Sequence, residues 1–187
     1  MIHKSAATPL ASPSPGFTLL EALVVVALLA LVLGLSVPGM TGWRERRQLQ
    51  AEVEDFWNSL MLARAQAVLH QRHVSVCTGG GDLCDPLADW HQGWLVFVDA
   101  NRNGIRDSGE QLLQRRAPLS ERVRMRGNSA VTHHIGYGAE GRSESLSGGF
   151  QAGTIAACAL GQNTGWRLII NAVGRPRLEQ ADTPSCS

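Results

Sequence analysis

The chain has 187 residues, and its 17 Lys and Arg against 16 Asp and Glu leave a formal net charge of +1 at pH 7. This length argues against several domains and suits one modest domain. With 20 glycines and only 5% aromatic residues, the composition favours short strands and turns over a large helical bundle.

Residues 1–16 are rich in Ser, Pro and Ala, carry the single lysine, Lys4, and are predicted to be a leader that is removed. An apolar run over residues 22–37 follows Gly16-Phe17-Thr18-Leu19-Leu20-Glu21. Because a helix needs about 20 apolar residues to cross a bilayer, residues 17–41 are predicted to be a transmembrane and assembly helix.

Glu21 lies at the start of this apolar run, where a carboxylate needs a partner, because at the centre of a membrane helix a charge costs about 2.5–3.5 kcal/mol. Cleavage after Gly16 would free an α-amine on Phe17. The amine of one subunit could then neutralise Glu21 of the next in a filament.

Residues 42–187 are predicted to form one globular domain of the α+β class. An amphipathic helix over about 42–73 is indicated by apolar residues at steps of three and four, from Leu49 to Ala67. It would continue the apolar helix as one long helix, bent or loosened near Gly34 and Pro38. Strands separated by turn residues are then expected at 74–77, 93–99, 111–115, 123–126, near 133–137, 153–159, 166–171 and 175–179.

Four cysteines fit a compartment in which disulfides persist. Proximity favours a bond between Cys77 and Cys84, which would leave Cys158 and Cys186 to attach the C-terminal tail, although three pairings are possible. A zinc site is the alternative, but the cysteine spacing lacks the usual tight ligand pairs.

Asp99, Asn101, Asn103, Gly104 and Glu110 match the spacing of a calcium-binding EF-hand loop. Both flanks are predicted strands rather than helices, so a hairpin turn closed by Asp and Asn side chains is expected instead. Calcium-dependent adhesion through this loop is the least favoured of the functions considered below. His70 and His73 stand three apart on the predicted helix, and His133 and His134 are adjacent. None of these pairs has carboxylates or cysteines at matching spacing, so surface histidines are expected. No catalytic motif is found, so we expect neither an enzyme nor a cofactor.

Arginine is unevenly distributed. Residues 17–110 hold 7 Arg and 11 acidic residues, whereas residues 111–187 hold 9 Arg and 5 acidic residues. Arg122, Arg124 and Arg126 alternate with apolar residues, which would send them to one face of a strand. In Gly174-Arg175-Pro176-Arg177 the two arginines would also point one way, and Pro176 indicates an edge strand. Such forks suit phosphate, but a solvated edge is the simpler interpretation of two arginines alone.

The segment from Gly16 to Glu21 with its apolar tail resembles the leader and N-terminal helix of type IV pilins and type II secretion pseudopilins. The downstream order resembles the FimT/GspH group of minor pilins and pseudopilins. That resemblance rests on four segments, namely 94–104, 109–113, 135–142 and 174–177.

The resemblance implies cleavage after Gly16 by a prepilin peptidase, N-methylation, insertion in the inner membrane with a periplasmic domain, and assembly with other pilin subunits into an extracellular pilus. FimT-like pilins associated with DNA uptake carry a GRxR motif near the C-terminus. This implies that Gly174, Arg175 and Arg177 bind DNA phosphates in natural transformation. Further DNA contacts are possible at Arg124, Arg126, Arg142 and Arg167. The alternative is a GspH-like minor pseudopilin of a type II secretion system.

Overall fold

The computed structural model describes the backbone of residues 16–36 and 40–182, and the side chains of residues 16–32 and 42–182. The chain divides into two compact units, residues 1–42 and residues 43–187. Pro38 and Cys186, along with most of the predicted leader, lie outside the described residues.

The first unit contains helix α1 (Leu19–Ser36). The Glu21 N–H donates to Thr18 Oγ1 at 3.3 Å, which satisfies one of the free donors of the first turn. Large apolar side chains of α1, such as Leu19 and Leu31, are exposed. Within the described residues, no helix combines the length and the apolar character needed to cross a membrane, so the single membrane pass over residues 17–41 stays a prediction.

Helix α2 (Met40–His70) dominates the second unit, and it ends three residues earlier than predicted. Gln71 adopts a left-handed φ of 52°, and the Arg72 N–H reaches back to the Ala67 carbonyl at 3.2 Å. This six-to-one hydrogen bond is the usual way for a chain to leave a helix, and β1 begins directly after it.

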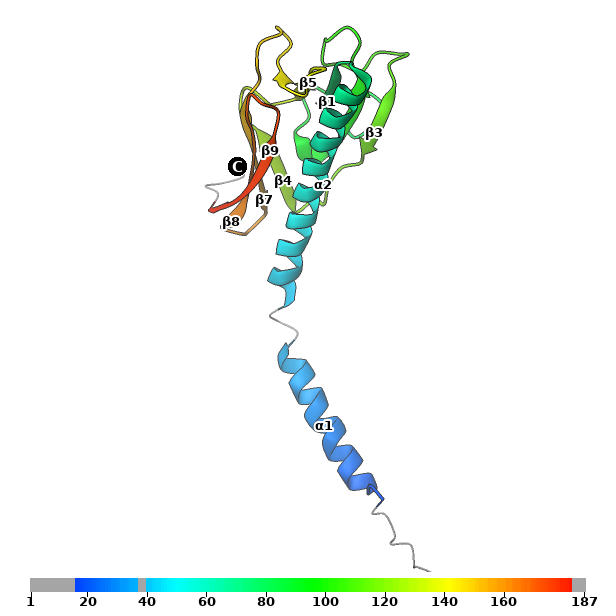
Figure 1. The fold of residues 1–187 in the computed structure, drawn as a ribbon. Helices are drawn as coiled ribbons and strands as arrows, with labels where there is room; N and C mark the ends of the chain where they lie inside the picture. The colour runs from blue at the N-terminus through cyan, green and yellow to red at the C-terminus, as the bar shows by residue number, and fades with distance from the viewer. Residues whose placement is uncertain (1–15, 37–39, 183–187) are drawn as a thin grey trace, which may run out of the picture. The chain divides into compact units, whose positions relative to one another are not determined.

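Two antiparallel sheets follow the helix (Figure 1). Sheet A has the order β3-β2-β1-β5-β6 and sheet B the order β4-β7-β8-β9. The strands of sheet A are β1 (Val74–Thr78), β2 (Trp94–Val98), β3 (Leu112–Arg116), β5 (His134–Tyr137) and β6 (Ser143–Glu144). Those of sheet B are β4 (Val123–Gly127), β7 (Gly153–Ala159), β8 (Thr164–Ile170) and β9 (Pro176–Asp182). All eight predicted strands are present, and the α+β class is confirmed. The prediction missed β6 and the short 3-10 helix η2 (Trp90–Gln92).

One core joins α2 to both sheets. The helix contributes the apolar face predicted from its spacing, including Val53, Phe56 and Leu60. Phe56 contacts both Trp90 and Trp94, with ring centroids about 5 Å apart. A smaller cluster of Cys77, Leu95 and Phe97 packs on the opposite face of sheet A. Both clusters lie within residues 43–187, so we expect this unit to fold without the first.

Candidate nucleic-acid interface

The outer face of sheet B carries four of the arginines that were predicted to contact DNA, namely Arg124, Arg126, Arg167 and Arg177. Register places Arg126, Ala156, Arg167 and Glu179 side by side across the four strands. Arg124 and Arg177 lie two residues from this row on their own strands and therefore share its face. Between them, Val123 and Met125 of β4 point into the core. The alternation predicted for β4 is confirmed.

Gly174 and Arg175 form the turn that leads into β9, which is an edge strand as Pro176 predicted. Gly174 is buried with a φ of +77°, and a Cβ there would collide with the carbonyl oxygen of Gly141. The Arg175 N–H donates to Asn171 Oδ1 at 3.1 Å. The first carbonyl of β9, that of Pro176, accepts from Trp57 Nε1 of α2 at 3.0 Å. The turn is thus held from both sides, while the Arg175 and Arg177 side chains are exposed.

Arg142 comes from a distant stretch of sequence but reaches the same place. It lies in the loop between β5 and β6, whose backbone packs directly against Gly174. Ser143 Oγ donates to the Asn171 carbonyl at 2.9 Å, which ties this loop to the turn of sheet B. The structure therefore places the loop that carries Arg142 against the turn that carries Arg175.

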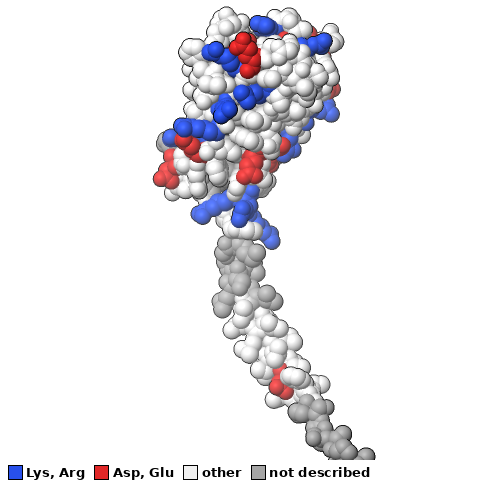
Figure 2. Space-filling view, in the orientation of Figure 1, with Lys and Arg blue, Asp and Glu red and all other residues white. Residues whose placement is uncertain are grey.

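The arginines differ in how far acidic groups neutralise them. Arg177 pairs with Glu179 at 2.9 Å and Arg126 with Asp89 at 2.9 Å. Within residues 16–36 and 40–182, no carboxylate forms an ion pair with Arg142, Arg167 or Arg175. Figure 2 shows positive and negative side chains interspersed over the visible face of the second unit. The candidate interface is consequently a set of separate arginines rather than a broad basic patch.

The processing residues are accessible in the first unit. A Cβ added at Gly16 would meet no atom within 4 Å, Phe17 is exposed, and Glu21 follows on the first turn of α1. A peptidase could reach the bond between Gly16 and Phe17 without unfolding described structure.

The predicted disulfide between Cys77 and Cys84 is confirmed. Cys158 on β7 is also disulfide-bonded, and its predicted partner Cys186 lies outside the described residues. Cys84 Sγ accepts the Arg106 N–H at 3.2 Å. The disulfide thus anchors the loop that follows β2.

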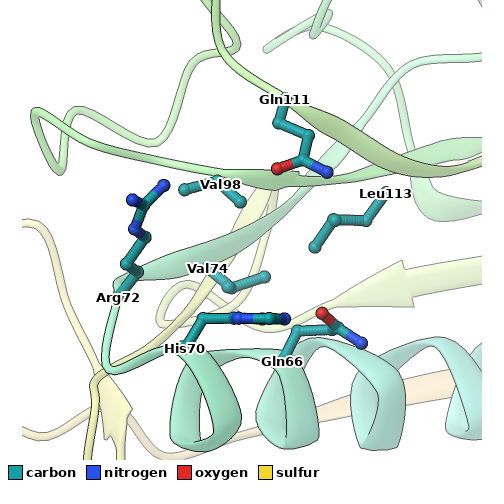
Figure 3. Close-up of a pocket in the computed structure, with 7 residues that line it drawn as sticks. All are labelled: Gln66, His70, Arg72, Val74, Val98, Gln111 and Leu113. Carbon is teal, nitrogen blue, oxygen red and sulfur yellow. The ribbon is translucent and has the colours of Figure 1, made fainter.

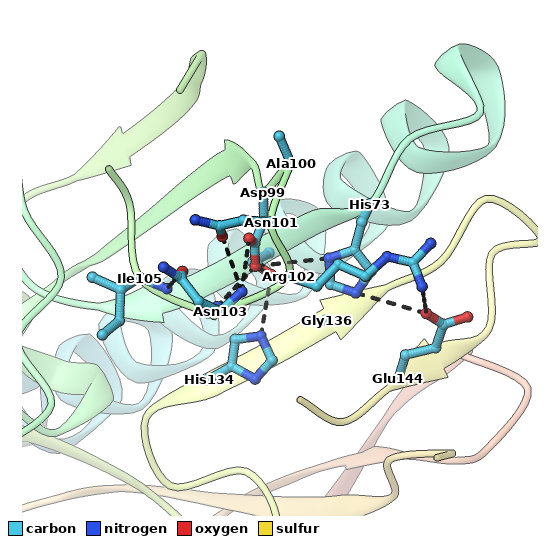
Figure 4. A network of polar contacts seen from close by, with 12 residues as sticks. His73, Asp99, Ala100, Asn101, Arg102, Asn103, Ile105, His134, Gly136 and Glu144 are labelled. Carbon is cyan, nitrogen blue, oxygen red and sulfur yellow. Dashed lines mark hydrogen bonds and ion pairs between the residues drawn. The ribbon is translucent and has the colours of Figure 1, made fainter. Parts of the chain in front are cut away.

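That loop is the Asp99–Glu110 stretch, and it is organised by the buried Asp99 (Figure 4). Asp99 accepts from Ser75 Oγ at 2.6 Å and from the Gly104 N–H at 2.9 Å. The Asn101 and Asn103 side chains cap backbone N–H groups two residues ahead, as a turn closed by Asn and Asp side chains requires. Within the described part of the chain, no group of three or more His, Cys, Asp or Glu is placed to hold a metal ion.

Two histidines behave differently from the surface histidines that we predicted. His73 is buried, with Nδ1 3.7 Å from Asp99 and Nε2 3.8 Å from Glu144, and burial lowers its pKa in spite of those carboxylates. His134 Nε2 lies 3.1 Å from Ser75 Oγ. Burial also lowers the pKa of His134, to about 4. No spacing in the sequence links these residues.

His70 points elsewhere. It lines a cavity of about 250 Å³ under the end of α2, together with Gln66, Arg72, Val74, Val98, Gln111 and Leu113 (Figure 3). His70 and His73 therefore do not form a pair that could bind one metal ion. The lining of this cavity is partly apolar and partly polar.

Residues 52–174 match the family model of the type II transport protein GspH. The chain belongs to the GspH family. Residues 13–37 also match the prokaryotic N-terminal methylation motif, so the chain is a pilin-like protein of the type IV pilus or type II secretion class.

Solved structures share this fold. The type IV minor pilin FimU of Pseudomonas aeruginosa is 24% identical with a TM-score of 0.56, and the match covers 73% of this chain and 92% of FimU. The type II secretion minor pseudopilin EpsH of Vibrio cholerae is 13% identical with a TM-score of 0.51, covering 75% of this chain and 98% of EpsH. No curated protein matches this chain.

Proposed function

We propose that this GspH-family protein is a minor pilin of a type IV pilus that binds DNA without sequence preference. It is made in the inner membrane, trimmed after Gly16, and assembled with other pilin subunits. The observation that carries the proposal is that Arg167 and Arg177 share the outer face of sheet B. Arg175 lies in the turn that leads into β9, and the loop that carries Arg142 packs against that turn. Such a pilin would serve DNA uptake in natural transformation.

The exposed arginines described above suit phosphate better than bases. A guanidinium offers several donors in a planar fork that matches phosphate, and Arg175 and Arg177 are exposed at the edge strand β9. Phosphate contacts position a protein on DNA but carry no sequence information. Glu179 opposes this by neutralising Arg177, so we expect weak binding that depends strongly on salt.

The experiment is a titration of duplex DNA with residues 43–187, followed by fluorescence anisotropy at several salt concentrations. Arg175→Ala/Arg177→Ala should lose most of the affinity, and its slope against the logarithm of salt concentration should fall by up to about 1.8, since each phosphate contact contributes about 0.9. Arg44→Ala/Arg47→Ala, which removes two exposed arginines of α2, is the matched control for net charge and should bind almost as the parent does.

A second candidate is a GspH-like minor pseudopilin of type II secretion, favoured by the family match and by the fold shared with EpsH. In that case the outer face of sheet B would be ordinary solvated surface. If the parent fragment fails to bind DNA at low salt, or if the two double variants weaken binding equally, the pseudopilin becomes the better account.

A further inference from the structure

An open cavity of about 450 Å³ adjoins the contact between Gly141 and Gly174. The side chains that line it include Arg102, Glu140, Arg142, Glu144 and Phe150. They come from the loop after β2, the loop between β5 and β6, and the segment after β6. Arg142 lines this cavity, and the backbone of its loop packs against Gly174, so the cavity lies next to the turn that carries Arg175.

The walls of the cavity are held in place by contacts to the rest of the fold. Arg64 Nε of α2 donates to the Gly141 carbonyl at 2.9 Å, and the Gly138 N–H donates to the Arg142 carbonyl at 3.0 Å. The Glu144 carboxylate lies 4.0 Å from Arg102 Nη1 and 3.8 Å from His73 Nε2 (Figure 4). Arg102 itself adopts a left-handed φ of 59°, which is uncommon for a residue with a side chain.

Phe150 is the unusual member of this group. The residue is 70% exposed, although its backbone is held by a β-bridge with Glu144. An aromatic ring held at the edge of a cavity beside arginines combines the two elements that bind single-stranded nucleic acid, namely a surface for stacking a base and cations that follow the backbone.

We propose that this cavity accepts one unpaired nucleotide of a DNA strand bound along sheet B, with its base stacked on Phe150 and its phosphate beside Arg142. The inference rests on the proposed DNA-binding function and specifies its ligand as single-stranded DNA or the frayed end of a duplex. A base inside a duplex cannot present its face to a ring, because both faces are stacked on neighbouring bases. The volume lies within the range of small-ligand sites, about 300–1,000 Å³.

The carboxylates on the cavity wall are compatible with this ligand. Glu144 is already offset by Arg102 and is turned toward Gly138, so it does not face an incoming phosphate alone. Glu140 is exposed on the rim, where it can accept hydrogen bonds from base N–H groups, as acidic side chains do with cytosine N4.

The test compares a short single-stranded oligonucleotide with its duplex, both titrated with residues 43–187 at the same salt concentration. Phe150→Ala should weaken single-strand binding by about tenfold or more, in line with the loss of one stacked base, and should change duplex binding by less than about twofold. Phe150→Trp should bind the single strand about as tightly as the parent does. The fluorescence of the added tryptophan should be quenched by the single strand. An unchanged urea midpoint for both variants would show that the exposed site tolerates the substitutions.

Three outcomes separate this inference from the proposed function. If Phe150→Ala leaves single-strand binding unchanged, or weakens the binding of both ligands equally, the stacking site is refuted. Arginine-dependent DNA binding then still stands. If Arg175→Ala/Arg177→Ala weakens the binding of both ligands, and Phe150→Ala weakens only the binding of the single strand, both proposals hold. If the parent binds neither ligand, both fall together.

Discussion

His134 shows how one residue can make stability depend on pH. Its ring lies against Ser75, beside the buried Asp99 and the second histidine, His73. Burial lowers its pKa from 6.5 to about 4. The unfolded chain therefore binds a proton at a higher pH than the folded chain does, and each unit of difference corresponds to about 1.4 kcal/mol.

We predict that the free energy of unfolding of residues 43–187 falls as the pH is lowered from about 6.5 to about 4, with His134 contributing up to about 3 kcal/mol. Above about pH 6.5 the contribution of His134 to the free energy of unfolding no longer changes with pH. His134→Gln keeps a polar side chain but cannot take up a proton there, so its stability should depend less on pH. Urea unfolding at a series of pH values measures this, with His70→Gln at the exposed end of α2 as control. Parallel profiles for the parent and His134→Gln would show that the histidine is not responsible for the pH dependence.

Residue-level interpretation from sequence was correct where the reason was local. The apolar face of α2, the alternation of β4 and the edge position of Pro176 depend only on neighbouring residues. The surface position expected for His73 was wrong, because β1 begins directly after it and the loop around Asp99 folds over it. Phe150 carried no signal at all, since a single phenylalanine beside a glycine turn suggests neither exposure nor a neighbouring cavity.

At the scale of elements, the turn between β8 and β9 decides where the candidate interface lies. It must bring Arg175 out of sheet B and still let the loop between β5 and β6 approach. Gly174 makes both possible, because its φ is positive and the space for a Cβ is already occupied by Gly141.

We predict that Gly174→Ala destabilises residues 43–187 by about 1–3 kcal/mol, since a residue with a side chain is strained at this φ and the neighbouring loop must also move. Gly161→Ala in the preceding turn of the same sheet is the matched control. Gly161 has a φ of +80° with no atoms near its missing Cβ, so its substitution should cost only the backbone strain. Urea denaturation compares the two. Equal losses would indicate that the contact with Gly141 carries no energy.

The order of helices and strands was largely predictable, because eight strands can be recognised from alternating apolar residues and flanking turn residues. The pairing of those strands was not. Neighbours such as β1 and β5, or β4 and β7, are separated by long stretches of chain, and their order depends on which apolar faces α2 covers. The two-residue strand β6 is too short for any periodicity to show.

At the scale of the whole molecule, the two units carry different tasks. The first holds the methylation motif and the apolar helix α1. The second holds the core and the proposed ligand sites. Since the cleavage site and the proposed ligand sites lie in different units, processing can be tested without reference to DNA.

We predict that Gly16→Leu leaves the full-length precursor uncleaved in cells that contain a prepilin peptidase, because a bulky residue cannot replace glycine next to the cleaved bond. Glu21→Ala should be cleaved normally, since its proposed role lies in subunit assembly. Intact mass of the membrane-extracted protein distinguishes the forms. A mature-sized Gly16→Leu product would contradict cleavage at this position.

The sequence alone determined the family, the order of helix and strands, the first disulfide and the residues that carry charge, because each of these depends on composition, local periodicity or short spacing. The tertiary structure decided which of those residues meet. It packed the loop of Arg142 against Gly174, buried His73 against Asp99, and placed Phe150 in the lining of a cavity. These contacts join segments far apart in the chain, and they form only because α2 holds both sheets on one core and Gly174 lets the two meet at its edge.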